Sequence, residues 1–590
     1  MSRGRQSTFA LLLFPGALVA APLLLPEFYI TLLNYIGLYA TVALGLVLLT
    51  GVGGLTSFGQ AAFVGLGAYT TAYLTTVFGV SPWLTLPAGL LLTGLVAWSL
   101  GRVTLRLSGH FLPLGTIAWG IALYYLFGNL GALGGHTGIS GIPPLPFVDL
   151  ELRSGRAFCY LIWAVLLLLM LITRNLLDSR EGRAIRALKG GSLMAEAMGV
   201  NTPRSKIVIF TVAALYASIS GWLYAHLQRF VNPTPFSLTQ GIEYLFMAVV
   251  GGVAHVRGAV VGAGLITILK QWLQDWLPSL LGKSGNFEMI AFGLLMIFVL
   301  HRARDGVWPI IQRFYPPSVV RARAVEAPAL PRRPLPAAGS VLLEVKDASK
   351  RFGGLVANDR MSFRVRAGEV LALIGPNGAG KSTLFDGISG VDPLTSGAVS
   401  FRGERIESLP AREVARRGMS RTFQHVRLLP AMNVLENVAV GTHLRGRKSF
   451  VAAACRADRD EESRLLREAA AQIERCGLAG QMYELAGSLP LGKQRLIDIA
   501  RALAADPCLL LLDEPAAGLR YLEKQALANL LRRLRAEGMG ILLVEHDMDF
   551  VMGLADRVVV MEFGQKLAAG LPEEIQCNPA VVEAYLGGVE

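Results

Sequence analysis

A phosphate-binding loop is predicted near the middle of the chain. Residues 375–382 read Gly-Pro-Asn-Gly-Ala-Gly-Lys-Ser, the pattern G-x-x-x-x-G-K-S, directly after the apolar run 371–374. In such a loop the glycines let backbone N–H groups surround phosphate oxygens, the lysine reaches the outer phosphates and the serine hydroxyl ligates Mg²⁺. The helix that follows turns its positive end toward the anion. A chance glycine-rich turn is the alternative, but the strand before the loop and the apolar pair Leu384-Phe385 after it favour nucleotide binding.

Two further apolar runs end in acidic residues. Residues 509–512 precede Asp513-Glu514, and residues 541–544 precede Glu545-His546. Buried parallel strands deliver such side chains to one edge of a sheet, where a phosphate loop also lies. There we expect Asp513 to hold Mg²⁺ through water and Glu514 to polarise the attacking water. A lone histidine is usually part of a core, but His546, in this order at a strand end, is expected to sense the γ-phosphate.

The composition requires a membrane-embedded part. The chain has 590 residues, of which 53% are hydrophobic, and its mean hydropathy is +0.47. The net charge of +13 does not predict a nucleic-acid partner, because the arginines lie beside apolar spans and in a linker, as on the cytoplasmic side of membrane proteins. The five cysteines have neither C-x-x-C nor Cys/His spacing, so they indicate neither a cysteine-ligated metal site nor a disulfide framework.

Apolar runs predict about ten membrane spans, since a crossing helix needs roughly 20 residues. They are residues 9–25, 28–50, 57–78, 82–100, 110–132, 157–173, 205–228, the two parts of 241–273 divided at 254–258, and 287–301. The first run also resembles a signal peptide, and 241–254 is short enough to be re-entrant. Starting inside, the basic residues after the fourth and sixth spans fall on the cytoplasmic side.

Two stretches of this half carry more than hydrophobicity. Residues 53–69 are rich in glycine and place Ser57 and Gln60 at or inside the bilayer. They predict either a tightly packed helix pair or a broken segment lining the translocation path. Residues 174–204 have apolar residues at helical spacing, which favours a short docking helix over a solvated connector. Its expected contacts are Leu193, Met194 and Met198, with the nearby arginines only orienting it.

The predicted fold class is therefore multi-domain. An all-α polytopic membrane domain occupies residues 1–303, a Pro/Arg-rich cytoplasmic linker residues 304–340, and an α/β P-loop ATPase domain residues 341–590. The composition of the linker should resist packing and keep it extended on the cytoplasmic membrane face.

The motifs together resemble an ABC transporter fused in one polypeptide. Gln424 and the run 489–494, Leu-Pro-Leu-Gly-Lys-Gln, resemble the Q-loop and signature of ABC ATPases. The sequences Phe-Gly-Gly-Leu, Arg-Thr-Phe-Gln and Pro-Ala-Ala-Gly resemble those of the ATP-binding subunit of bacterial branched-chain amino acid importers; they begin at 352, 421 and 515. Independently, residues 55–63 and 181–184 resemble the permease of the same systems.

This resemblance implies a set of site residues. ATP would be bound by Phe352, Gly375, Asn377, Gly378, Gly380, Lys381, Ser382, Thr383, Pro490, Gly492 and Gln494. Mg²⁺ would be held by Ser382, Gln424 and Asp513, and catalysis would fall to Glu514, His546 and Gln424. The chain departs from the family pattern at Pro490 in place of a serine, at Lys493 in place of a neutral residue, and at Arg520 in place of an acid or amide. We expect a working but altered site, because Gly492 keeps the helix N-terminus that would face phosphate.

The resemblance further implies an importer of the bacterial inner membrane with its ATPase domain in the cytoplasm. Its partners would be a second permease, a second ABC ATPase, a periplasmic solute-binding protein, membrane lipid and a small solute, namely a branched-chain or related amphipathic amino acid. Importers of urea, amides or aromatic acids are alternatives, as is an exporter half-transporter, although many short spans and a single docking loop fit an importer better. A membrane-anchored regulatory ATPase is disfavoured, because an anchor has no need of polar, glycine-rich spans.

Overall fold

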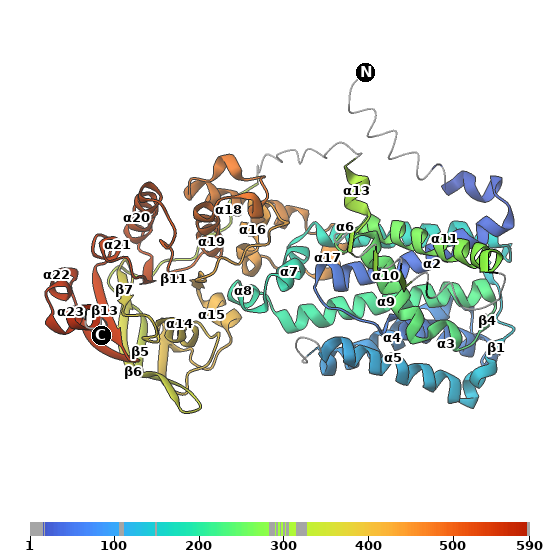
Figure 1. The fold of residues 1–590 in the computed structure, drawn as a ribbon, viewed down its shortest axis with the longest axis horizontal. Coiled ribbons are helices and arrows are strands. Elements are labelled where there is room, and N and C mark those ends of the chain that lie inside the picture. Colours follow the sequence, from blue (N-terminus) through green and yellow to red (C-terminus); the bar gives the residue numbers. More distant parts are fainter. Residues whose placement is uncertain are drawn as a thin grey trace, which may run out of the picture. The chain divides into compact units, whose positions relative to one another are not determined.

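The computed structural model describes residues 16, 18–105, 111–147, 150–281, 290, 293–294, 297–298, 301–302, 306–313 and 327–586 (Figure 1). The chain divides into two compact units, which we treat separately. The first comprises residues 1–177 and 203–319, and the second comprises residues 178–202 and 320–590. The segment 178–202, which the sequence analysis placed in the permease domain, thus packs with the second unit.

Six helices of the described part are long and apolar enough to cross a membrane. They are α2 (Glu27–Leu46) with its π-helical extension η1 (Val47–Val52), α4 (Pro82–Thr104), α5 (Phe111–Asn129), α6 (Gly155–Leu177), α9 (Thr202–Gln228) and α11 (Val256–Leu281). Shorter helices accompany them: α3 (Gln60–Val77), α10 (Leu238–Gly252) and α13 (Trp308–Gln312). The count of about ten spans stays a prediction, because residues 9–15 and 17 of the first span and most of 287–301 lie outside the described residues.

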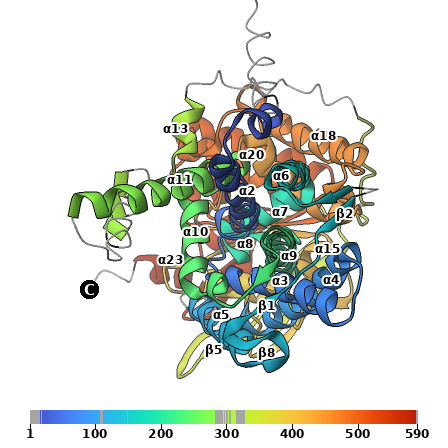
Figure 2. The same cartoon turned by 90° about the vertical axis from the view of Figure 1, so that its right-hand side faces the viewer.

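Helix α2 lies at the centre of the first unit and α9 beside it (Figure 2). The apolar window of α2 is 78% buried, whereas those of α4, α5 and α11 are each 28% buried. Small residues allow the close approach that dense packing in lipid requires. A Cβ at Gly221 of α9 would lie 2.0 Å from the Val64 carbonyl oxygen of α3. The outer helices accordingly present leucine and tryptophan side chains where lipid is expected.

The membrane helices are interrupted at two glycine-rich places. Residues 53–59 are irregular between η1 and α3, and a turn at 253–255 separates α10 from α11. The predicted break within 241–273 is therefore present, whereas the membrane crossing of the 15-residue helix α10 stays a prediction. At the ends of helices, two small antiparallel pairs join β1 (Ile139–Ser140) to β4 (Phe230–Val231) and β2 (Leu145–Phe147) to β3 (Leu150–Leu152).

The second unit is built on a six-stranded sheet in the order β10-β11-β12-β7-β13-β14. The strands are β10 (Met419–Arg421), β11 (Leu509–Asp513), β12 (Gly540–Val544), β7 (Val370–Ile374), β13 (Arg557–Glu562) and β14 (Gln565–Gly570). Only the β13–β14 pair is antiparallel. A second sheet in the order β6-β5-β8-β9 contains β5 (Val341–Phe352), β6 (Leu355–Arg366), β8 (Ser396–Phe401) and β9 (Glu404–Arg405).

Successive side chains of the buried strands point to opposite faces of the sheet and so form two separate cores. Leu509 and Leu511 of β11 pack with the second sheet and helix α14, whereas Leu510 and Leu512 pack with helices α16, α18, α19 and α20. The helices of this unit are α14 (Lys381–Ile388), α15 (Ala411–Arg417), α16 (Val434–Ala439), α17 (Phe450–Ala454), α18 (Arg459–Arg475), α19 (Leu491–Ala504), α20 (Tyr521–Ala536), α21 (Met548–Met552), α22 (Pro572–Gln576) and α23 (Pro579–Leu586).

Residues 327–340 run over the surface of the second unit without regular structure. Arg467 donates a hydrogen bond to the carbonyl of Ala327, and Arg445 donates to that of Pro331 at 2.8 Å. The backbone N–H of Arg333 donates to Asp506 at 2.5 Å. The expectation that the whole linker resists packing is therefore wrong for this part, because proline-rich backbone offers carbonyl acceptors that arginine can reach. The rest of the linker, from 314 to 326, lies outside the described residues.

Candidate active site

Three parallel strands bring the predicted catalytic residues to one edge of the sheet. Strand β12 lies between β11 and β7, so that Asp513 pairs with Val544 and Val544 pairs with Leu373. The loop after β7, the acidic pair after β11 and His546 after β12 therefore all leave the sheet at its carboxyl edge, as the sequence predicts. Such an edge is where α/β proteins bind ligands.

The phosphate loop has the backbone that its glycines permit. Gly378 and Gly380 have φ angles of +82° and +93°, and a Cβ at Gly380 would lie 2.2 Å from the carbonyl oxygen of Ala357. The ammonium group of Lys381 donates to the carbonyls of Gly375 at 2.7 Å and Pro376 at 2.8 Å. Lys381 thus folds back over the loop that would surround phosphate.

Asp513 is a buried carboxylate that is only partly neutralised. The side chain is 2% exposed, and Arg421 approaches Oδ2 at 3.6 Å. Its Oδ1 has no hydrogen-bond partner among the described residues. Burial raises the pKa of Asp513 to about 6, against the opposing effect of the Arg421 guanidinium. Burial also lowers the pKa of Lys381, and the carboxylates of Glu514 and Asp513 oppose that shift. Cation and carboxylates therefore act on one another across a single site.

Glu514 and His546 face each other across the ends of β11 and β12. Glu514 Oε1 lies 3.6 Å from His546 Nδ1. The backbone of Glu514 is left-handed, with φ of +49°, and is held by its N–H donating to Val544 and by its carbonyl accepting from Arg495 at 2.6 Å. Because both peptide groups are fixed, the carboxylate is aimed at the histidine despite the strained conformation.

Sequence reasoning assigned no role to three residues that hold this site. Glu545, fully buried, accepts the N–H groups of Ala516 at 2.6 Å and His546 at 3.2 Å and so ties the two loops together. Arg421 joins Asp386 of α14 at 2.5 Å and contacts Asp513, and Arg495 holds the Glu514 backbone. Arg421 and Glu545 lie beside quoted motif residues, but only the fold shows what they contact.

The remaining predicted ligands lie on the rim. Asn377, Gly378, Ser382 and Gln424 are exposed, and Thr383 is half-buried. Phe352 is 49% exposed, with the Lys350 ammonium 5.0 Å from its ring centroid. An exposed aromatic ring is available for a base to stack on, as the resemblance implies.

The signature residues make their contacts around the start of α19. Pro490 is the N-cap of α19 and supplies no side-chain cap. A Cβ at Gly492 would lie 2.9 Å from a carboxylate oxygen of Glu523, and Gln494 turns back to donate to the carbonyl of Leu489 at 2.7 Å. The hydrogen bonds of the described residues join none of these three signature residues to residues 375–382.

The segment 178–202 forms a docking surface with the ATPase part of its unit. Helices α7 (Arg180–Lys189) and α8 (Ser192–Ala197) bring Met194 and Met198, both fully buried, into one cluster with Phe423, Leu429 and other apolar side chains. Leu193 is 41% exposed, so the prediction is confirmed for the two methionines and wrong for Leu193. A residue adjacent to Met194 in a helix points to a different side.

An arginine also belongs to this docking surface, contrary to the expectation that arginines only orient it. Arg183 and Glu462 are each about 5% exposed and form a forked ion pair, with Nη2 donating to Oε2 at 3.1 Å and Nη1 donating to Oε1. Nearby, Arg180 donates to the carbonyl of His443 at 3.2 Å. Burial first, and then the charges of Arg180 and Arg183, lower the pKa of His443 to about 3. His443 is therefore neutral at physiological pH.

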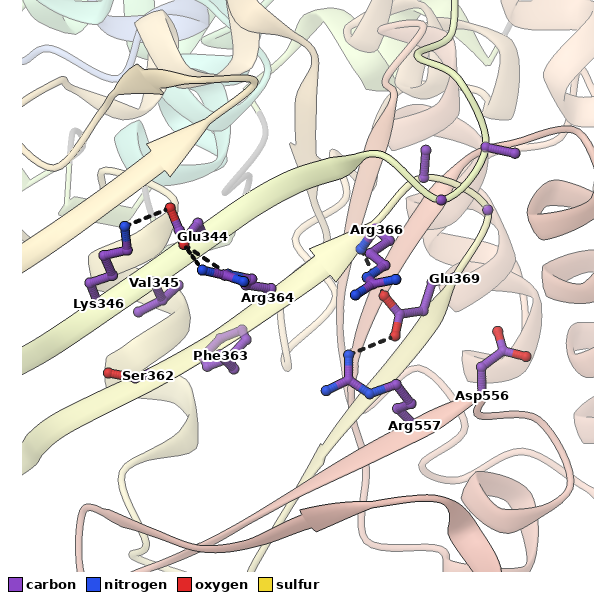
Figure 3. Close-up of a pocket in the computed structure, with 14 residues that line it drawn as sticks. Glu344, Val345, Lys346, Ser362, Phe363, Arg364, Arg366, Glu369, Asp556 and Arg557 are labelled. Atoms are coloured by element: carbon purple, nitrogen blue, oxygen red, sulfur yellow. Dashed lines mark hydrogen bonds and ion pairs between the residues drawn. The ribbon is translucent and has the colours of Figure 1, made fainter.

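A hollow of about 740 Å³ lies elsewhere in the second unit, between β5, β6 and the start of β7 (Figure 3). Both glutamates that line it are paired with arginines: Glu344 contacts Arg364 at 2.6 Å, and Glu369 contacts Arg557 at 3.1 Å. Since these carboxylates are neutralised and the hollow contains none of the phosphate-loop residues, it is a solvated face of the sheet rather than the active site.

Comparison with known proteins places both halves of the chain in one transport system. Residues 28–300 match the permease component of branched-chain amino acid transport systems, 358–517 match ABC transporters, and 565–590 match the branched-chain amino acid ATP-binding cassette transporters. The high-affinity branched-chain amino acid transport ATP-binding protein LivG of Salmonella typhimurium is 43% identical over 249 residues, which are 42% of this chain and 98% of that protein. The chain belongs to the branched-chain amino acid ABC transporters.

A second relative of the same transport family matches the second unit in the same way. The corresponding protein BraF of Pseudomonas aeruginosa is 41% identical over 42% of this chain and 98% of its own length. A solved nucleotide-free ATP-binding cassette from an ABC transporter is 32% identical and is matched over its whole length by 42% of this chain, with a TM-score of 0.38. As an ABC transporter ATPase, this chain binds and hydrolyses ATP.

We expect Lys381→Ala to weaken ATP binding roughly ten-fold or more, because a charge-assisted contact to phosphate is lost. Nucleotide titration and phosphate release measure the effect. Lys346→Ala, which removes an exposed lysine, is the matched control. Unchanged affinity and turnover in Lys381→Ala would show that residues 375–382 do not hold the nucleotide.

Glu514→Gln should still bind ATP but hydrolyse it on the order of 10²–10⁴ times more slowly, since the shape is kept while the base is lost. The variant should accumulate as a closed, ATP-bound ATPase pair, which size-exclusion chromatography detects. Glu583→Gln, at an exposed position, controls for the loss of a carboxylate. Hydrolysis at the normal rate would remove Glu514 as the base.

Replacing both Met194 and Met198 with aspartate should undock the loop, because unpaired charge would be buried in an apolar cluster. ATP binding should survive, whereas solute-stimulated hydrolysis and transport should vanish. Leu193→Asp, at the exposed neighbouring position, should leave both intact. Normal transport by the double variant would place the coupling contact elsewhere, with the turn at 255–257 as the next candidate.

Proposed function

We propose that this chain supplies a permease and an ATPase of an importer that couples ATP hydrolysis to the uptake of branched-chain or related amphipathic amino acids across the bacterial inner membrane. The observation that carries this proposal is the buried docking of Met194 and Met198 beside Phe423, the residue before Gln424. A permease loop seated next to the ATP site is what coupling of hydrolysis to transport requires. The names of LivG and BraF, both branched-chain amino acid transport proteins, support the solute class.

In this proposal the ATP site works by positioning and electrostatics. The backbone N–H groups of residues 377–383 and the ammonium group of Lys381 bind the phosphates, and Phe352 stacks on adenine. Glu514 takes a proton from the attacking water, and His546, 3.6 Å away, contacts the γ-phosphate. Pro490, Gly492 and Gln494, which no hydrogen bond of the described residues joins to this chain's own loop, act on the nucleotide of a second ABC ATPase subunit.

The residues also fit a magnesium ion. Oxygen ligands suit Mg²⁺, and the unpartnered Oδ1 of Asp513 is a buried carboxylate oxygen with capacity for a cation. Ser382, Gln424 and Asp513 would hold the ion, which when bound offsets phosphate charge. Arg421 keeps Asp513 in place through Oδ2, leaving Oδ1 for that role.

The membrane half is proposed to cross the inner membrane about ten times, with the ATPase in the cytoplasm. Residues 53–69 are proposed to line the path. Ser57 and Gln60 are buried next to the irregular stretch 53–59, and neither the Ser57 hydroxyl nor either end of the Gln60 amide has a hydrogen-bond partner among the described residues. Unsatisfied polar groups in lipid are costly, and they favour a path over a packed helix pair.

The transporter would work with a second permease, a second ATPase and a periplasmic solute-binding protein. Uptake of urea, amides or aromatic acids, and export, are the alternatives, and the match of both halves to branched-chain amino acid systems disfavours them.

Reconstitution with these partners in proteoliposomes tests the solute class. We expect leucine, isoleucine and valine, presented on the binding protein, to stimulate ATP hydrolysis and to accumulate in an ATP-dependent way. Urea and acetamide are the control solutes, because they are soluble in water like the amino acids but are not zwitterions. Stimulation by urea or an amide alone, or ATP-driven movement away from the ATP side, would contradict the proposal.

A further inference from the structure

An ion pair between a buried carboxylate and a half-buried lysine lies in the membrane unit. Glu243 of α10 is 6% exposed, and its Oε1 accepts a hydrogen bond from Lys270 Nζ of α11 at 2.7 Å. Helices α10 and α11 pack against each other and against α2 (Figure 2). Charged groups in lipid are costly and are found where they serve a solute or ion path. Apolar side chains would join the two helices without that cost.

Near the pair, α10 and α11 carry other buried polar atoms that have no hydrogen-bond partner among the described residues. A Cβ at Gly251 would touch the carbonyl of Gly258, and one at Gly262 that of Met247, which fixes an antiparallel pairing. Continuing this pairing by four residues on each helix places Glu243 opposite residue 266. Gln240 and Thr267 are one helical turn before Glu243 and Lys270, respectively. The Nε2 of Gln240 and the hydroxyl of Thr267 are buried without a partner among the described residues.

Tyrosine rings pack between α10 and α2, and one of them follows Glu243 in the sequence. Tyr244, next to Glu243, is 3% exposed, and its ring centroid lies 5.5 Å from that of Tyr39. Tyr39 in turn lies 5.6 Å from Tyr35. Opposite charges, spare hydrogen-bonding atoms and apolar ring faces thus occur together, and these are the groups that an amphipathic zwitterion contacts.

We propose that Glu243 and Lys270 bind the ammonium and the carboxylate of the transported amino acid, with Tyr39 and Tyr244 beside its apolar side chain. When solute arrives the pair parts, and each charge takes the opposite charge of the zwitterion. The exchange leaves no buried charge unpaired, and one ion pair is replaced by two. The side chain of Lys270 is 37% exposed, so the described residues do not enclose its ammonium group. The assignment rests on the proposed import function.

The competing explanation is that the pair only fastens α10 to α11. A fastener and a solute site differ in what happens when both charges are removed together. A neutral pair leaves nothing unpaired in the membrane, so the helices stay packed, but it offers a zwitterion no partner.

The test uses ATP-driven uptake of radiolabelled leucine by the complete transporter in proteoliposomes. We expect Glu243→Gln and the double variant Glu243→Gln/Lys270→Met each to lower uptake roughly ten- to hundred-fold. Arg156→Met, which breaks the exposed ion pair with Glu27 in the same unit, should transport normally. The melting temperature of the double variant should stay close to that of the unmodified chain.

Normal leucine uptake by the double variant would overturn the assignment, and so would its failure to fold, which would make the pair a fastener. An equal loss in Arg156→Met would also overturn it, since any broken ion pair would then suffice. If the unmodified transporter moves another solute but no leucine, the proposed function fails instead. The two failures are thus distinguishable.

Discussion

Residues 421–423 are held from several sides at once, and the site and the docking surface both depend on that. Arg421 contacts Asp386 and Asp513, and the Thr422 hydroxyl accepts the backbone N–H of Asp513 at 3.3 Å. The next side chain, Phe423, packs in the cluster that contains Met194 and Met198. One short strand end therefore touches the carboxylate of the ATP site and the permease loop. Because packed interiors transmit small shifts, movement at either end displaces the other.

The helix that carries the signature is connected to the same segment. Asp498 of α19 accepts the N–H of Phe423 at 3.5 Å, and Arg501, fully buried, donates to the carbonyl of Arg427 at 2.8 Å. The helix after the phosphate loop, the signature helix α19 and the docked segment 178–202 thus all contact residues 421–427. The membrane unit differs, since its helices pack through glycine and alanine, and its buried polar side chains include Ser57, Gln60 and the carboxylate of the Glu243–Lys270 pair.

The features that could be predicted from the sequence are those whose backbone geometry is set by the spacing of neighbouring residues. The glycine pattern at 375–380 dictates the loop, and an apolar run before Asp513 dictates a buried strand with its acids at the edge. The break between α10 and α11 follows from small residues between apolar runs. The predictions that were wrong concern contacts with residues that are distant in the sequence. The exposure of Leu193 depends on which face of a six-residue helix meets Phe423. The packing of residues 327–340 depends on arginines more than a hundred positions away, such as Arg445 and Arg467. The partner of Arg183 is 279 positions along the chain.

That last pair has a consequence for the choice of partner. Glu462 lies in a dry site with Arg183 as its matching cation, so a permease loop without a cation at this position would leave the carboxylate buried and alone. The penalty for such a mismatch exceeds the gain from the correct match. In a cell that makes several related transporters, Glu462 would then act by exclusion, rejecting loops from other permeases even where their apolar residues fit the groove as well as Met194 and Met198 do.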